Sequence, residues 1–290
     1  MSKAKILIQL DSDPQPSVFD SVVAIDSGVD QLFRHGGVEL NQVQGLVHGA
    51  MFTRGPQDLK SSAVFVGGSN VQQGEEMLRA VTGSFFGPVR VSVMMDSNGS
   101  NTTAAAAVVA AGRHLDLNAT TALVLGSTGP VGQRVVRLLA SAGSTVKAAS
   151  RSLDRSQSVV QAVSEAREGA KLEAVEIRDE AALATALDGI DLVVAAGAAG
   201  VELLSDDQRR NSEVKVAIDL NAVPPVGIGA VDVMDSAAEK NGQIVYGAIG
   251  VGGTKMKIHK AALHRLFESN EAVLDADEIY AIGLELESST

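Results

Sequence analysis

Short apolar runs alternate along the chain with segments of helical periodicity. The runs are rich in Val, Ile, Leu and Ala and end in glycine or small polar residues, which is typical of strands buried on both faces of a sheet. Their alternation with helical segments predicts a parallel α/β architecture. The predicted strands cover residues 6–10, 63–66, 89–95, 121–125, 145–149, 172–177, 192–195, 214–218 and 243–246.

Helices are predicted in the intervals between these strands. Pro16 and Ser17 open the first one, because proline is favoured in the first turn of a helix. A long amphipathic helix is expected to begin after Gly253, and a short one closes the chain. The other predicted helices cover roughly residues 71–81, 102–114, 130–142, 153–168 and 180–187.

A polar connection at residues 115–120 predicts a division into two domains. We expect residues 1–115 to form an N-terminal α/β domain that binds the substrate. Residues 116–254 are expected to form a Rossmann-like parallel-sheet domain that binds a dinucleotide. The C-terminal helices, within residues 255–290, are expected to pack back on the first domain.

The strongest local motif is a glycine-rich turn between a predicted strand and a predicted helix. The first glycine permits the tight turn, the second lets the backbone approach a pyrophosphate, and the third lets the helix pack closely on the strand. The helix N-terminus then offers N–H groups to the phosphates. An ordinary strand-turn-helix glycine cluster is the alternative, and a Walker A loop is excluded because no Gly-Lys-Ser/Thr follows. The predicted cofactor residues are Gly126, Thr128, Gly129, Pro130, Val131 and Gly132.

The end of the next strand indicates which dinucleotide is bound. NAD enzymes usually carry an acid there that accepts a hydrogen bond from the ribose 2′-OH. This chain has Ser150, Arg151 and Ser152 instead, and an arginine with hydroxyls suits a 2′-phosphate. A solvated surface arginine is the alternative. NADP is therefore favoured, NAD use stays open, and Asn221 is predicted to complete the cofactor site.

Three polar segments are predicted to follow strands of the first domain and are candidates for the substrate site: Asp11–Asp13, Thr53–Gly55 and Asp96–Thr103. The last is the densest, with seven small polar or acidic residues among its eight. Helix capping accounts for two or three of them, so we expect the others to bind a ligand.

Lys255 and Lys257 follow the glycine run Gly250–Gly253 at what is predicted to be a helix start. Cations at a helix start oppose the helix dipole. We therefore favour the interpretation that these lysines contact an anionic or carbonyl-rich ligand; the alternative is that they are ordinary surface lysines. The five histidines show no metal-like pairing and the chain has no cysteine, so no metal site is expected.

Composition narrows the possible partners. The 290 residues carry a formal net charge of −11, and nucleic acid is not expected as a partner because it requires a basic footprint. The longest apolar run, Ala104–Ala111, is too short to span a bilayer. The first residues contain no signal-like stretch. We expect a cytoplasmic protein without membrane partners.

Further short segments, distributed in order over nearly the whole chain, are more specific than the glycine turn. They are Asp11–Asp20, Thr53–Gly55, Phe85–Pro88, Asp96–Thr103, Gly129–Gly132, Glu202–Leu204, Pro224–Pro225, Gly227–Gly229, Lys255–Lys257, Leu266–Ser269 and Asp277–Tyr280. Together they resemble the methylene-tetrahydromethanopterin dehydrogenases of methylotrophic bacteria.

The resemblance implies oxidation of the methylene bridge of a tetrahydropterin to the methenyl cation, with hydride passed to NADP or NAD. It implies a homo-oligomer, either a trimer or a hexamer. Lys255 matches the family's active-site lysine, and we interpret its role as orienting the pterin, because a protonated amine repels the product cation. Ser152 departs from the second cation expected after Arg151 in strictly NADP-dependent relatives. Besides Lys255, the residues implied to line the pterin pocket are Asp13, Asp20, Asn98, Ser100 and Thr102.

Three alternatives stay open. A methylene-tetrahydrofolate dehydrogenase, with or without cyclohydrolase activity, would share the reacting bridge. A shikimate- or quinate-type dehydrogenase has a similar two-domain plan, but its Lys/Asp catalytic pair after an early strand does not stand out in this sequence. A non-catalytic dinucleotide sensor would keep only the Rossmann half, and the polar segment at Asp96–Thr103 argues against it.

Overall fold

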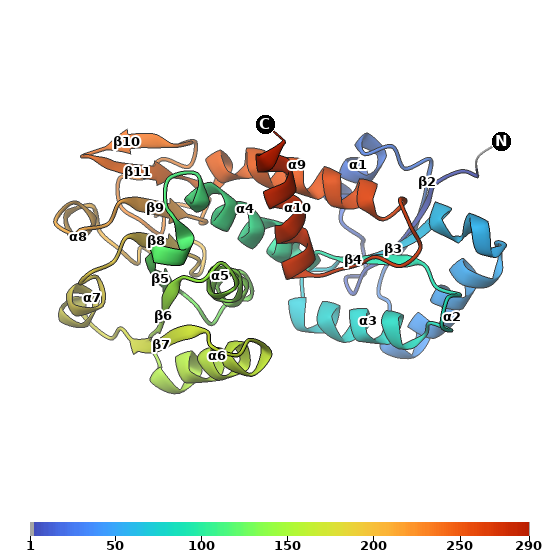
Figure 1. The fold of residues 1–290 in the computed structure, drawn as a ribbon, viewed down its shortest axis with the longest axis horizontal. Coiled ribbons are helices and arrows are strands. Elements are labelled where there is room, and N and C mark those ends of the chain that lie inside the picture. The colour runs from blue at the N-terminus through green and yellow to red at the C-terminus, as the bar shows by residue number, and fades with distance from the viewer. Residues whose placement is uncertain (1–2, 290) are drawn as a thin grey trace. The chain divides into compact units, whose positions relative to one another are not determined.

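The computed structural model describes residues 3–289, and the chain forms two compact units (Figure 1). The first unit takes the chain up to Thr102 and again from Met256, and the second comprises Thr103–Lys255. Both division points fall inside helices, α4 (Ser100–Gly112) and α9 (Ala248–Arg265). The sequence analysis placed the first division in the connection that follows α4.

A five-stranded parallel sheet forms the centre of the first unit, in the order β12-β4-β3-β1-β2. The sequence analysis missed β2 and β12. The first is an edge strand in which exposed and half-buried residues mix, so it lacks an apolar run, and the second has only two residues. The strands are β1 (Ile6–Leu10), β2 (Gln31–His35), β3 (Ser62–Val66), β4 (Ser92–Met95) and β12 (Val273–Leu274).

Helices cover both faces of this sheet. Helix α2 was not predicted, although Val43 and Val47 lie one turn apart and are fully buried. They form a core with Met77 and Val81 of α3, and α2 and α3 lie together on one side of the sheet in Figure 1. The helices that lie wholly in this unit are α1 (Val18–Asp26), α2 (Leu40–Phe52), α3 (Val71–Gly83) and α10 (Ala276–Ser288).

The second unit has a seven-stranded sheet in the order β7-β6-β5-β8-β9-β11-β10, parallel except for the β10–β11 pair. Chain order reverses between β5 and β8, where ligands of doubly wound sheets bind beyond the carboxyl ends of the strands. The Rossmann prediction is confirmed by this order. The strands are β5 (Thr121–Leu125), β6 (Thr145–Ser150), β7 (Lys171–Glu176), β8 (Leu192–Ala195), β9 (Val216–Asp219), β10 (Ala238–Lys240) and β11 (Gln243–Tyr246).

Helices of the second unit pack on this sheet through small apolar residues. Leu183 and Ala186 of α7 join a core with Leu123 and Leu125 of β5. The apolar run Ala104–Ala111 belongs to α4, and none of its residues is more than 2% exposed. The helices that lie wholly in this unit are α5 (Pro130–Ser141), α6 (Leu153–Ala166), α7 (Glu180–Ala186) and α8 (Asp206–Arg210). Across residues 3–289, no helix combines the length and the apolar character needed to cross a membrane.

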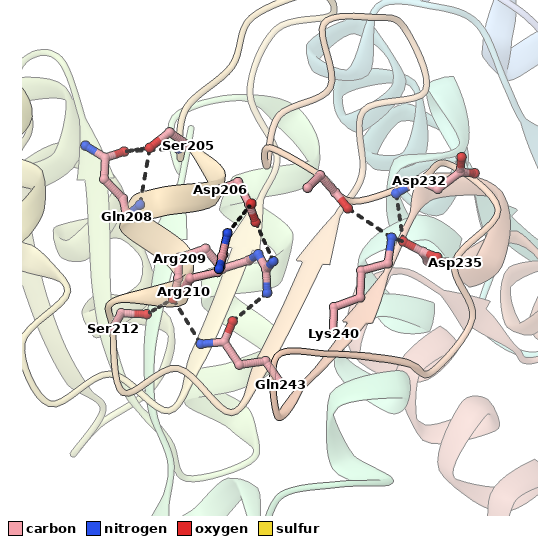
Figure 2. Close-up of polar contacts among 11 residues, drawn as sticks. Ser205, Asp206, Gln208, Arg209, Arg210, Ser212, Asp232, Asp235, Lys240 and Gln243 are labelled. Carbon is pink, nitrogen blue, oxygen red and sulfur yellow. Dashed lines mark hydrogen bonds and ion pairs between the residues drawn. The ribbon is translucent and has the colours of Figure 1, made fainter.

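A buried arginine fixes α8 to the sheet (Figure 2). Arg209 is 0% exposed and donates at 2.6 Å to Oε1 of Gln243 in β11 and at 2.6 Å to Asp206. The hydrogen bond from Arg209 holds the pKa of Asp206 below its usual value. In the same view, Lys240 of β10 pairs with Asp235. These cations serve the fold, since each is bound to groups of its own unit.

The prediction that a helix starts after the glycine run Gly250–Gly253 is wrong. Helix α9 begins at Ala248, so the glycines lie inside its first turns. A Cβ on Gly250 would lie 1.7 Å from the Asp235 carbonyl oxygen, which means that this glycine permits close packing. Lys255 therefore lies in the second turn or beyond, away from the N-terminal dipole.

The prediction that Thr53–Gly55 follows a strand is also wrong. Thr53 is the C-cap of α2, and the segment leads into the amino end of β3. Arg54 donates to the carbonyl oxygens of Ser61 at 2.6 Å and Ala4 at 2.9 Å, just before β3 and β1. This segment therefore ties the amino ends of two strands, whereas parallel sheets bind ligands at the carboxyl ends.

Candidate functional site

The glycine turn lies at the switch point of the second sheet, between β5 and α5. Gly126 has φ +74°, and a Cβ there would lie 2.7 Å from the backbone nitrogen of Gly197, which follows β8. A Cβ on Gly132 would lie 2.3 Å from the Gly126 carbonyl oxygen. The fold thus requires both glycines, one for the turn and one for the packing of helix on strand.

Gly129 is different, because no protein atom requires it to be glycine. A Cβ there would make only ordinary contacts, 3.5 Å from the Gly126 oxygen and 3.6 Å from the Ala196 oxygen. Gly129 is the N-cap of α5 and offers no side-chain cap, and Pro130 follows in the first turn. The N–H groups of Val131 and Gly132 thus have no side-chain cap, and the bare backbone fits a pyrophosphate.

The intervening residues hold the turn in shape. Ser127 is fully buried, and both its N–H and its hydroxyl donate to the Ala149 carbonyl oxygen, at 3.1 and 3.0 Å. Thr128 is half-buried, and its carbonyl accepts a hydrogen bond from Gln133 at 2.9 Å. The turn is therefore anchored to the end of β6, where the ribose is expected.

The end of β6 leaves a cation exposed. The Ser150 hydroxyl accepts from the Ser152 N–H at 3.2 Å, which turns the chain. Arg151 is exposed, and it makes no ion pair with any residue of the described chain. Its guanidinium is available to an anion. A contact between Arg151 and a 2′-phosphate stays a prediction.

Asn221 lies in the loop after β9 and bonds within that loop. Its Nδ2 donates to the Pro225 carbonyl at 3.2 Å, and its Oδ1 accepts from the Val223 N–H at 2.9 Å. Asp219 accepts the N–H groups of Asn221 and Ile228, and burial nevertheless raises the pKa of Asp219. A cofactor contact by Asn221 stays a prediction, and its evident role is to shape the loop.

In the first unit, the exit of β1 is organised by a buried carboxylate. Asp11 is 0% exposed and accepts the N–H groups of Asp13 at 2.9 Å and Ser17 at 3.2 Å. Both carboxylate oxygens of Asp13 accept from Ser69, at 2.8 and 2.9 Å. Asp20, half-buried in the first turn of α1, is held through its N–H by the Ser17 hydroxyl. The Asp13 carboxylate is therefore fixed by Ser69, and the backbone of Asp20 is fixed by the helix cap.

The exit of β4 uses far more of its polar groups internally than capping alone predicted. Asp96 accepts the N–H groups of Asn101 and Thr102, both at 3.0 Å, and the Thr102 hydroxyl at 2.6 Å. The Ser100 hydroxyl donates to the Ser97 carbonyl at 2.8 Å. Asn98, with φ +53°, is the exposed member. Five side chains bond within the unit: Asp96, Ser97, Ser100, Asn101 and Thr102.

The two candidate lysines differ in their surroundings. Lys255 is half-buried, and its Nζ donates to the Thr103 hydroxyl at 2.9 Å, which fixes it beside the residue that follows Thr102 in α4. Lys257 is exposed. The Lys255 ammonium is therefore held in place by the protein, as an orienting role would require.

A cluster of aromatic rings that was not predicted lies on the face of the first sheet opposite to α2 and α3. His259 of α9 is 0% exposed and stacks on Phe65 of β3, with ring centroids 5.9 Å apart and planes inclined by 10°. Its Nδ1 lies 3.9 Å from Asp96. Phe19 of α1 is 53% exposed, with its ring 6.4 Å from His259. Only the fold joins these residues, since they come from distant parts of the chain.

Metal ligation has no support in the described residues. Across residues 3–289, no group of three or more His, Asp or Glu side chains could hold a metal ion.

Comparisons with known proteins match segments of both units. Residues 18–98 match the family model "Methylene-tetrahydromethanopterin dehydrogenase, N-terminal", and residues 118–210 match the NmrA-like family. The chain is 44% identical, over 99% of its length and 100% of the relative's, to the "Bifunctional protein MdtA" of Methylorubrum extorquens. It is 29% identical to the NAD(P)-dependent methylenetetrahydromethanopterin dehydrogenase of the same organism, over 93% of this chain and 94% of that one. The chain belongs to the methylene-tetrahydromethanopterin dehydrogenase family.

Family membership confirms the resemblance carried by the short segments. A solved structure similar to the chain supports the fold alone. Quinate dehydrogenase from Corynebacterium glutamicum, in complex with NAD, aligns with a TM-score of 0.52 and 13% identity, over 97% of this chain and 99% of that one.

Proposed function

We propose that the chain is an NAD(P)-dependent dehydrogenase that oxidises 5,10-methylene-tetrahydromethanopterin to the 5,10-methenyl form in one-carbon metabolism. The observation that carries the proposal is that one chain of this family contains both of the units that the reaction requires. An N-terminal unit matches the pterin dehydrogenase model, and a Rossmann unit keeps the glycine turn uncapped.

A bound nicotinamide dinucleotide supplies the hydride acceptor. The chain's own residues bind and orient it. The N–H groups of Val131 and Gly132 would bind its pyrophosphate, Gly129 would leave space for it, and Arg151 would bind the ribose side. Arg151 without an ion pair favours NADP, and the absence of a second cation at Ser152 leaves NAD as an alternative acceptor.

Oxidation of the bridge needs no general base, because the methenyl cation is delocalised over two nitrogens and keeps its remaining proton. The reaction is then accelerated by orientation of the pterin against the dinucleotide and by stabilisation of the developing positive charge. Lys255, held by the Thr103 hydroxyl, orients the pterin through hydrogen bonds, since its positive charge repels the product. The carboxylates of Asp13, which Ser69 holds, and of Asp20 favour the cation electrostatically.

The cluster of aromatic rings supports the same substrate class. A pterin is flat, and the exposed ring of Phe19 offers a face to it, next to the buried His259 and Phe65 pair. Among the predicted substrate residues, Asn98, with φ +53°, and Lys257 are the two that are exposed. We assign these two to the substrate, with Ser100 and Thr102 acting mainly through the shape of the β4 exit.

Initial rates test the proposal. Methylene-tetrahydromethanopterin and methylene-tetrahydrofolate are each assayed with NADP and with NAD, at matched concentrations. We expect turnover with the methanopterin substrate and a higher kcat/KM with NADP. Turnover with the folate substrate alone would overturn the substrate assignment, and binding of NADP without turnover of either pterin would leave only a dinucleotide-binding protein.

We also propose a homo-oligomer, a trimer or a hexamer, in the cytoplasm. The exposed apolar residues Val18, Val22 and Ile25 of α1 support association, because a monomer rarely exposes so many on one helix. Light scattering coupled to size-exclusion chromatography measures the mass, and cell fractionation tests the location.

A further inference from the structure

We propose that Glu176 and Arg178, at the end of β7, set the preference between NADP and NAD. The proposal rests on the proposed function, since it requires a dinucleotide on the Gly126–Gly132 turn. Neither residue belongs to the predicted cofactor set, because each comes from the strand after the one that carries Arg151.

Strand register places Glu176 beside the expected ribose position. In the parallel pairing of β6 with β7, Glu176 is the partner of Ser150, and the Ile177 N–H donates to the Ser150 carbonyl at 2.8 Å. Arg151 and Ser152 follow Ser150 directly. A carboxylate thus lies one strand away from the place where NAD enzymes carry their acid.

One oxygen of Glu176 joins the two segments. Its Oε1 accepts the Leu153 N–H at 3.1 Å, immediately after Ser152, and also pairs with Nη2 of Arg178 at 2.9 Å. The Arg178 guanidinium and the Leu153 N–H therefore contact the same carboxylate oxygen and lie close to each other. Its side chain is 73% exposed, so it can turn toward a ligand without breaking a packed contact.

The two charges act differently on the two dinucleotides. A 2′-phosphate carries nearly two negative charges at pH 7, so Glu176 repels it, while Arg151 and Arg178 attract it. NAD has a neutral 2′-OH at this position and is nearly insensitive to both charges. Arg178 supplies the second cation that Ser152 does not, and Glu176 limits its effect. The pair therefore changes the affinity for NADP selectively.

Calorimetric titration of the full chain with NADP, NAD, 2′,5′-ADP and 5′-AMP tests this without turnover. Glu176→Gln keeps an oxygen that can accept the Leu153 N–H and removes the charge. We expect its Kd for NADP and 2′,5′-ADP to fall about fivefold, with NAD and 5′-AMP within about twofold. Arg178→Gln is expected to raise the Kd for the two 2′-phosphates about tenfold. Both effects should shrink as salt is added.

Lys171→Gln is the matched control, since it removes one exposed positive charge at the opposite end of β7 and should change no Kd by more than about twofold. Equal changes for NADP and NAD in the Glu176 and Arg178 variants, with wild-type binding intact, would overturn this proposal alone. A wild-type chain that binds neither dinucleotide would overturn it together with the proposed function. Thermal unfolding of each variant checks that the fold is retained.

Discussion

The exit of β4 and the exit of β5 each lead from a parallel strand into a helix, yet they use their polar groups in opposite ways. At Asp96–Thr102, five side chains are bonded within the unit, and Asp96 alone accepts three hydrogen bonds. At Gly126–Gly132, the helix has no side-chain cap, and Gly129 is a glycine that the fold does not require.

The comparison teaches that a dense polar segment is weak evidence for a ligand site. Strand exits are also helix starts, and the first N–H groups of a helix need acceptors. Groups left without a structural role, such as the α5 N–H groups and Arg151, are better evidence. Substitutions at Asp96 and Thr102 test whether the β4 exit is structural, and substitutions at Gly129 and Gly132 test whether the β5 exit is functional.

The largest effect is expected from Asp96→Ala. The substitution leaves the buried N–H groups of Asn101 and Thr102 without an acceptor, so we expect the free energy of unfolding to fall by about 3 kcal/mol. Urea unfolding followed by circular dichroism measures it. The control is Asp116→Ala, an exposed cap with one hydrogen bond, for which a loss below about 1 kcal/mol is expected. Similar losses in the two variants would contradict a structural role for the β4 exit.

Lys255→Met is expected to lower kcat/KM for the pterin about a hundredfold, because orientation of the substrate is lost. Stability should change little. Lys257→Met, its exposed neighbour, should alter KM by less than about tenfold. Full kcat/KM in Lys255→Met would exclude the assigned role of this lysine.

Alanine substitutions at two glycines of the turn separate fold from function. A Cβ on Gly132 meets backbone, so Gly132→Ala should lose about 2 kcal/mol of stability along with NADP affinity. Gly129→Ala meets only ordinary contacts, so its Tm should stay unchanged while the Kd for NADP rises about tenfold. Calorimetry measures both quantities. If Gly129→Ala bound NADP like the wild type, the phosphates would not lie against this residue.

Thr102→Val removes the hydroxyl that donates to Asp96 at 2.6 Å. We expect a loss of about 1 kcal/mol in unfolding free energy, measured against Thr185→Val, whose exposed hydroxyl bonds to the preceding helical turn. A higher KM for the pterin without a loss of stability would instead assign Thr102 to the substrate.

The smallest effect concerns His114, in the connection between α4 and β5. The Nε2 atom of the His114 ring makes a hydrogen bond with the Tyr246 hydroxyl at 2.8 Å. Partial burial of the ring, with a smaller contribution from Arg113, lowers the pKa of His114 below its usual value of 6.5. The unfolded chain therefore binds the proton more readily, so stability should fall as the pH drops below 6.5. Comparing Tm against pH for the wild type and His114→Gln measures it. An identical slope in both would exclude His114 as its source.

The sequence by itself determined most of the buried strands, the Rossmann-like parallel sheet of the second unit and the glycine turn between β5 and α5. Buried parallel strands such as β3 and β5 are continuous apolar runs, and the contact that requires glycine at position 132 is with Gly126, which is close in the chain. Edge strand β2 and helix α2 escaped prediction, because β2 is half-exposed and α2 buries only a narrow stripe.

Only the tertiary structure decided which polar residues are used internally and which are free. The bond between Lys255 and Thr103, the stack of His259 on Phe65, and the carboxylate of Glu176 beside Leu153 each join residues distant in the chain. Local pattern fixes the conformation of the backbone, but a hydrogen bond or an ion pair depends on where several elements place their side chains. That is why the turn and Arg151 could be predicted from the sequence, whereas the positions of Glu176 and Arg178 could not.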